Sequence, residues 1–97
     1  MALQRLAALD SRGVSSPGTR DGVVTIPAGW KYLDTFDIEE FSQSEKSRCK
    51  LSFAHVGDKI TVRFVNEGSA GLFQAGVWWD IIVWLRFDDG KPPTVFK

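Results

Sequence analysis

Cys49 and His55 are the residues of this sequence with the greatest potential for nucleophilic chemistry, and each is the only residue of its type. A thiol and an imidazole act together when they lie within hydrogen-bond distance of each other. The segment that carries them alternates apolar and polar residues like a β-strand, and six residues of strand span ~20 Å. We therefore expect no catalytic pair here, and interpret His55 as a structural or surface residue.

Metal, phosphate and cofactor sites are not indicated either. One cysteine and one histidine cannot supply the usual ligands of a zinc site, and no G-x-x-x-x-G-K-[ST] phosphate motif occurs. The acidic residues lack the sharp glycine turn of a calcium loop, and we interpret them as part of a solvated loop; they are Asp34, Asp37, Glu39, Glu40 and Glu45. No acid–base pair can be assembled, so the sequence predicts a protein without cofactors, metals or enzymatic activity.

The segment GVWWDIIVWLRFDD, residues 76–89, holds three of the four tryptophans. As a helix it would be apolar on every side, and its β-branched and aromatic residues favour a strand. The odd positions of that strand form an unbroken apolar row that faces the core: Val77, Trp79, Ile81, Val83, Leu85 and Phe87. The even positions point to the opposite face: Trp78, Asp80, Ile82, Trp84 and Arg86.

This even-numbered face is too apolar for open water. Leaving its two indoles and Ile82 exposed would forgo several kcal/mol, and Trp and Arg are the residue types that most often dominate interfaces. We therefore predict that the face contacts a partner, with Asp80 and Arg86 paired across symmetry-related copies or with a neighbouring strand. The alternative is that the same chain covers it, through residues 1–21 or the C-terminal PPTVFK.

The middle of the chain has the period of two that is typical of strands. We expect a short strand at residues 23–26, a half-buried strand at 30–38, a long exposed loop at 39–48 and a β-hairpin at 49–64 turning at Gly57-Asp58. Five or six strands and no helix long enough for a crossover predict an all-β fold. The expected architecture is a small antiparallel β-sandwich or barrel, jelly-roll-like, with an extended N-terminal arm.

The N-terminal segment differs from the rest. A short Leu/Ala-rich piece precedes a linker rich in Ser, Gly and Pro, and a helix of about nine residues orders only by docking. We therefore divide the chain into an arm and linker (1–21), a β-domain (22–90) and a C-terminal tail (91–97). The leucines of the arm join the predicted interface: Leu3, Leu6 and Leu9.

Composition narrows the choice of partners. A chain of 97 residues makes one marginal domain, and a single cysteine forms no internal disulfide, so oligomerisation is the natural stabiliser. Twelve basic and twelve acidic residues give no net field for nucleic acid or a membrane surface. Because no signal peptide or ~20-residue apolar span is visible, we expect a cytoplasmic location unless the protein is viral.

The layout of a flexible arm, MALQRLAALDSRGVSSPGTRDG, then a compact Trp-rich β-domain and a Pro-containing tail resembles small bacteriophage virion proteins. Capsid decoration or cement proteins and tail-fibre head domains are the types it is most similar to. The resemblance implies a structural protein of the virion, a homo-oligomer (dimer or trimer) seated on a larger protein lattice with its arm on a neighbour. The alternative is a carbohydrate-binding or receptor-binding module in which Trp78 and Trp84 stack on a glycan.

Overall fold

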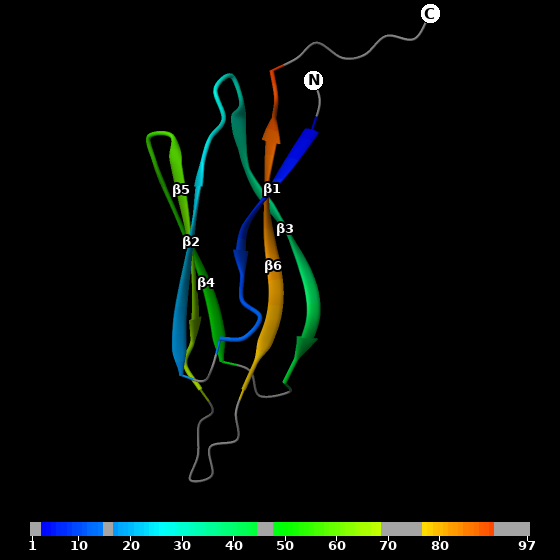
Figure 1. Cartoon of the computed structure of the whole chain (residues 1–97), viewed down its shortest axis with the longest axis vertical. Coiled ribbons are helices and arrows are strands. Elements are labelled where there is room, and N and C mark those ends of the chain that lie inside the picture. Colours follow the sequence, from blue (N-terminus) through cyan, green and yellow to red (C-terminus); the bar gives the residue numbers. More distant parts are fainter. Residues whose placement is uncertain (1–2, 15–16, 45–47, 69–76, 91–97) are drawn as a thin grey trace, which may run out of the picture.

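The computed structural model describes residues 3–14, 17–44, 48–68 and 77–90, and these form an all-β fold (Figure 1). The six strands are β1 (Leu3–Asp10), β2 (Gly18–Thr25), β3 (Lys31–Gln43), β4 (Cys49–Val56), β5 (Lys59–Asn66) and β6 (Trp79–Asp88). They make two three-stranded antiparallel sheets: sheet A has the order β1-β6-β3 and sheet B the order β2-β5-β4. The predicted all-β class is confirmed.

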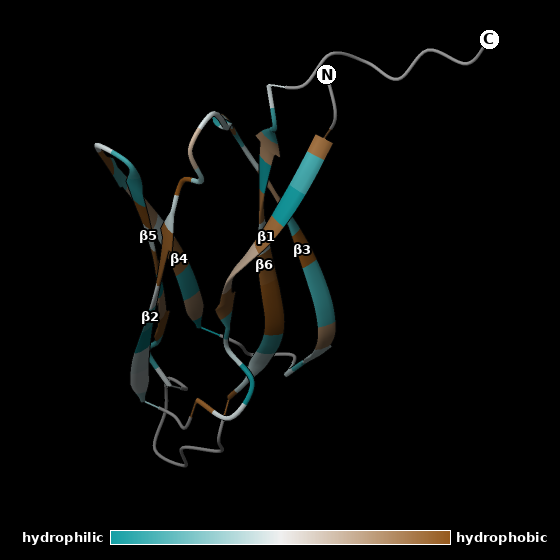
Figure 2. Cartoon of the chain, turned by 45° about the horizontal axis from the view of Figure 1, so that its top comes forward, coloured by the Kyte–Doolittle hydropathy of each residue, from teal (hydrophilic) through white to brown (hydrophobic). Residues whose placement is uncertain are grey.

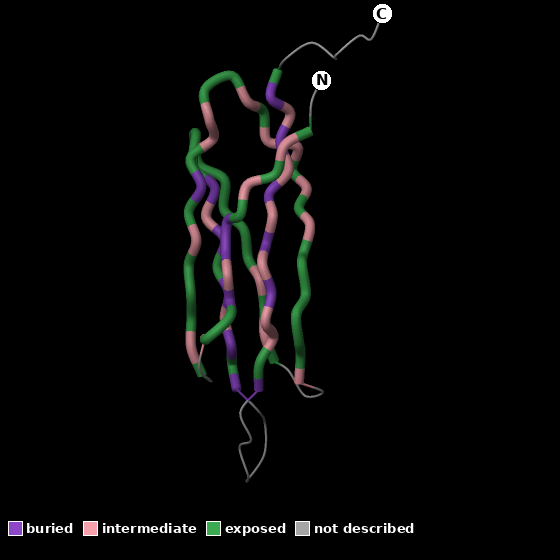
Figure 3. The backbone as a smooth tube through the Cα atoms, turned by 45° about the vertical axis from the view of Figure 1, so that its right-hand side comes forward, coloured by how far each residue is buried: buried purple, intermediate pink, exposed green. Residues whose placement is uncertain are grey.

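The hydrophobic core lies between β6 of sheet A and β5 of sheet B, the central strand of each. Figure 3 shows buried residues along these two strands and exposed residues along the edges, and β6 is hydrophobic over most of its length (Figure 2). The odd positions of β6 face the core, so the predicted alternation is confirmed. The largest fully buried side chains of the two strands are Ile60, Val62, Phe64, Ile81, Val83, Leu85 and Phe87.

β1 is the edge strand of sheet A, so the short helix expected for this segment is wrong. It pairs with β6 over its whole length, and the register shifts at a bulge between Ala7 and Leu9. The bulge brings Leu9 to the inside along with Leu6, while Leu3 stays 55% exposed. A leucine spacing of three is thus met by a bulged strand. The boundary that we placed at residue 21 falls inside β2.

β3 also extends further than expected, because it continues to Gln43 where the sequence predicted a loop from residue 39. Glu39 pairs with Ile82 and Glu40 with Ile81, and after a register shift at Phe41 the pairing continues with Ser42 and Gln43, so β6 supplies hydrogen-bonding partners to a polar segment. The loop prediction for 39–48 is therefore wrong over residues 39–43, and its residues 45–47 lie outside the described residues. The β4–β5 hairpin with its Gly57-Asp58 turn is confirmed.

Sheets A and B meet closely on one side only. Where β1 crosses β2, a Cβ added to Gly22 would lie 1.6 Å from the carbonyl oxygen of Ala8, so the two backbones touch. Ordinary packed sheets stand ~10 Å apart. Among the described strands, β1 contacts both β2 and β5, and no comparable backbone contact joins β3 to β4. The sandwich is therefore clamped along β1–β2 and open along β3–β4.

Candidate functional site

The outer face of β6, where the sequence predicted an interface, is partly covered by side chains of β1 and β3. The Trp84 ring is half-buried: its Nε1 donates a hydrogen bond to Glu39 Oε2 at 3.1 Å, and the Arg5 guanidinium lies 5.3 Å from its centroid. Asp37 Oδ2 lies 3.7 Å from both Arg5 and Arg86. The described chain itself thus supplies much of the cover that we assigned to a partner.

The polar residues of this face pair within sheet A. Arg86 reaches Asp37 on β3, and Asp80 accepts a hydrogen bond from Ser42 Oγ at 2.8 Å. Of the two pairings left open by the sequence, pairing with a neighbouring strand is the one observed for both residues. Half-buried Ile82 pairs in register with Asp10 and Glu39. The alternative that the C-terminal PPTVFK segment covers this face involves residues that lie outside the described ones.

The lower end of the same face keeps two aromatic rings in contact with solvent. Trp78, which precedes β6, is 47% exposed and Phe41 is 49% exposed. The Arg12 guanidinium lies 4.7 Å from the Phe41 centroid and binds Asp10 at 2.6 Å. Chiefly through that hydrogen bond, Arg12 lowers the pKa of the Asp10 carboxyl to about 2. The arginine therefore joins an aromatic ring and a carboxylate.

A second surface, which the sequence did not single out, lies on the open side of the sandwich. We call it the β3–β4 cleft, formed by the inner faces of these two edge strands. Phe36 and Ile38 pair with core residues of β6, and Phe53 pairs with a core residue of β5, so all three point inward. Nevertheless they remain 38%, 38% and 39% exposed. Apolar side chains that face inward but remain exposed to solvent indicate that the core is incompletely closed here.

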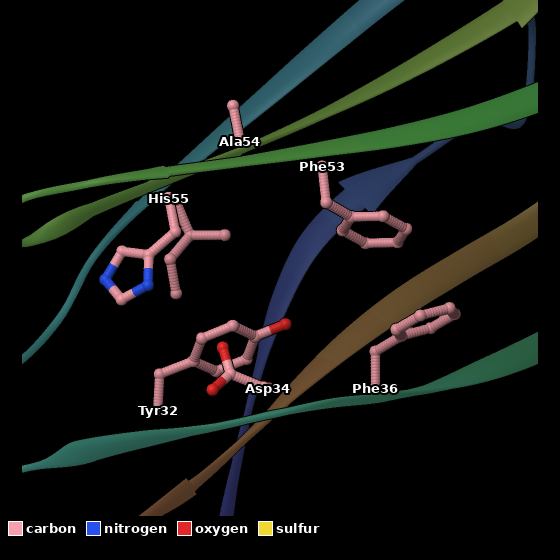
Figure 4. A pocket seen from close by; sticks show the side chains of 7 residues that line it. Tyr32, Asp34, Phe36, Phe53, Ala54 and His55 are labelled. Carbon is pink, nitrogen blue, oxygen red and sulfur yellow. The ribbon is translucent and has the colours of Figure 1, made fainter.

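The upper part of the cleft is a pocket of about 310 Å³ between β3 and β4 (Figure 4). The Phe36 and Phe53 rings stack across it with centroids 4.5 Å apart and planes inclined by 29°. Tyr32 meets the His55 ring edge to face at 5.7 Å, and these two lie on the other side of the pocket in Figure 4. Four aromatic rings from two sheets therefore line one opening.

Asp34 adds a carboxylate to this pocket through an unusual backbone conformation. It lies in a bulge of β3 between Tyr32 and Phe36, and its φ of +54° is in the left-handed region, which Asp tolerates better than most residues. Figure 4 places its carboxylate beside the Tyr32 ring. Burial, and secondly the charge of Asp34, raise the pKa of the Tyr32 hydroxyl. The carboxylate therefore acts electrostatically on the pocket interior.

Cys49 and His55 share the inner face of β4 but lie at its opposite ends, opposite Asn66 and Ile60 respectively. The described residues contain no group of three or more His, Cys, Asp or Glu side chains placed to hold a metal ion. Within the same ranges, there is no helix of the length and hydrophobicity required to cross a membrane.

Tyr32, Phe36 and Phe53 belong to segments that the sequence predicts as strands, but the sequence gives no sign that their side chains meet. Their meeting depends on which strands lie at the sheet edges, a non-local property. The sequence does not predict the positive φ of Asp34 either, because a single aspartate in an alternating segment does not indicate a bulge. No protein-family model, curated protein or solved structure shows a significant match to this chain.

Proposed function

We propose that this chain is a non-enzymatic interaction domain that associates with itself or docks on a larger protein assembly, using the β3–β4 cleft. One observation supports the proposal most directly. Phe36, Ile38 and Phe53 point toward the core, yet each keeps more than a third of its surface in water. A partner that fills the cleft would complete the core along the open side.

The energetic incentive follows from area. A covered phenylalanine buries roughly 150–250 Å², so the 38% and 39% exposures of Phe36 and Phe53 leave roughly 60–100 Å² of each open. At ~25 cal/mol per Å², covering both rings is worth about 3–5 kcal/mol. That is a large fraction of the stability of a small domain, which amounts to about 5–15 kcal/mol.

The tryptophan face of β6 is a secondary part of this proposal. Its exposed end, Trp78 with Phe41, offers a further apolar contact next to the edge of β3. A glycan platform on Trp78 and Trp84 has less support, because the Arg5 guanidinium occupies the space over the Trp84 ring. If the larger assembly is a virion, as the resemblance implies, the cleft would face a neighbouring virion subunit.

The test compares association of the wild-type chain with a Phe36→Gln/Phe53→Gln variant. Val56→Gln is the control, because Val56 is 77% exposed at the end of β4 and outside the cleft pocket. Sedimentation velocity measures self-association, and affinity capture from the source organism measures docking. We expect complexes that persist with the control and are lost with the double variant.

The proposal fails if the wild-type chain neither self-associates nor retains any protein, or if the double variant retains every complex. Circular dichroism shows whether the double variant is folded. Should it unfold, Phe36→Gln alone is used, since it leaves the ring on β4 in place. A folded single variant that binds like wild type contradicts the use of the cleft.

A further inference from the structure

The pocket in the β3–β4 cleft combines aromatic rings with a carboxylate. The same combination occurs at two other places in the molecule, and there it also includes an arginine guanidinium. On the outer face of sheet A, Arg5 lies over the Trp84 ring at 5.3 Å and near the Asp37 carboxylate at 3.7 Å. Arg12 likewise lies over Phe41 and binds Asp10. In both places one guanidinium makes a cation–π contact with an aromatic ring and an ion pair with a carboxylate.

The pocket has the aromatic rings and the carboxylate but no cation. Its rings are Tyr32, Phe36, Phe53 and His55, and its carboxylate is Asp34, which forms no ion pair with any residue that the structure describes. Neither lysine nor arginine lines the pocket. A volume of about 310 Å³ is small for a drug-sized ligand but ample for one long side chain.

We propose that this pocket binds an arginine side chain presented by a different protein. The guanidinium would lie against the ring surfaces that face the pocket, where cations are attracted to aromatic rings, and pair with Asp34, whose two oxygens match the guanidinium fork. The apolar stem of the arginine would cover the exposed parts of Phe36 and Phe53. This inference rests on the proposed use of the cleft and names the anchor of the partner.

A second copy of this chain is a poor source of that arginine. All six arginines of the sequence lie in the described residues, and each already has a partner. Even Arg20, which forms no ion pair with a carboxylate of the described residues, donates to the backbone carbonyls of Asp10 and Arg12 at 2.8 and 3.0 Å. A copy could offer an arginine only by breaking one of these contacts, so a distinct protein is the favoured source.

The experiment uses N-acetyl-arginine amide as probe and the neutral N-acetyl-citrulline amide as its matched control. Tyr32 is the only tyrosine in the chain, so its ring resonances and the absorbance change of its phenol report on the pocket alone. Arginine should shift the Tyr32 ring signals with millimolar affinity. It should also lower the pKa of Tyr32, because the guanidinium stays charged at the pH where phenols titrate. The citrulline control should neither shift the Tyr32 ring signals nor lower the pKa of Tyr32. The other titratable groups facing this phenol are Asp34 on β3 and His55 on β4.

The Asp34→Asn variant distinguishes recognition of the guanidinium charge from non-specific apolar binding in the pocket. Asparagine also tolerates a positive φ, so the bulge should persist while arginine binding weakens about threefold or more, as expected for an exposed ion pair. Asp80→Asn removes the same charge from the opposite face of sheet A and should leave binding unchanged.

Equal shifts with arginine and citrulline, or unchanged binding in Asp34→Asn, overturn the arginine anchor. If that happens while cleft-dependent association persists, the interaction domain stands and only the anchor is wrong. If cleft-dependent association is also absent, both proposals fall.

Discussion

Replacing Gly22 with alanine tests the clamp that holds the two sheets together along β1–β2. Gly22 pairs with the core residue Val62 of β5, so its missing side chain would point inward toward β1. The added Cβ would lie 1.6 Å from the Ala8 carbonyl oxygen, 2.8 Å from the Ala8 carbonyl carbon and 3.3 Å from the Leu9 Cα. All three neighbours are backbone atoms, so no side-chain rotation relieves the clash.

The magnitude follows from how far the strands must separate. An ordinary contact begins at 3.4 Å, so β1 and β2 must move apart by about 1.8 Å (3.4 − 1.6) at this point. A gap of 0.5–1 Å already forfeits a quarter to a half of the dispersion energy across a contact, and overpacked core sites cost about 1–3 kcal/mol or more. We expect Gly22→Ala to lower the free energy of unfolding by about 3 kcal/mol or more.

Urea unfolding followed by tryptophan fluorescence measures this loss. With a slope of about 1 kcal/mol per molar urea for a domain of this size, the midpoint should fall by about 3 M. Gly57→Ala is the matched control: its φ is +62° and an added Cβ meets nothing within 4 Å, so it should cost only about 1–2 kcal/mol of left-handed strain. The reasoning is refuted if the alanine at position 22 destabilises no more than the alanine at position 57.

Three further outcomes follow from individual contacts. Arg12→Gln should raise the pKa of Asp10 from about 2 toward 3.8, observed by NMR titration. Because the folded-state pKa of Asp10 is depressed, the stabilisation exists above pH ~4 and is lost as the pH falls toward 2, and it is small because both side chains are exposed to solvent. An unchanged Asp10 titration would contradict the role of Arg12. Ser11→Ala should cost about 1–3 kcal/mol in urea unfolding, because Ser11 is 2% exposed and its hydroxyl donates to the Trp79 carbonyl at 2.6 Å and accepts from the Ile81 N–H at 2.9 Å; an unchanged midpoint would contradict this. Asp34→Asn should lower the pKa of Tyr32 while leaving it above the ordinary value, since burial is the larger cause of its elevation; an unchanged absorbance titration would show that the carboxylate does not act on the phenol.

The parts of the fold that the sequence predicted are those set by local alternation. The odd positions of β6 are apolar without interruption, and a shift of one residue in the pairing register would expose all of them. The sequence therefore predicts both the strand and its buried face. The β4–β5 hairpin was readable because Gly57 and Asp58 form a two-residue turn between alternating segments. Each of these signals is contained within about ten residues.

The parts that the sequence did not predict depend on partners distant in the chain. The Leu/Ala-rich composition of residues 3–9 favours a short helix, but the segment is a strand, and the bulge before Leu9 reconciles its leucine spacing with that strand. The end of β3 is polar, so the sequence predicts a loop there, but β6, about 40 residues later, pairs with it as a strand. The cleft required knowing that β3 and β4 are both edge strands, which follows from strand order and not from composition.

The open side of the sandwich follows from the sizes of the side chains on its two seams. Along β1–β2 the inner position is Gly22, which has no side chain, and the sheets close until backbone meets backbone. Along β3–β4 the facing residues are Phe36 and Phe53, whose rings must lie between the sheets and stack at 4.5 Å. A glycine on one seam and a ring pair on the other impose different separations on the same two sheets. The cleft is thus specified by the residues on its seams, in the same way that the core is specified by the residues on β5 and β6.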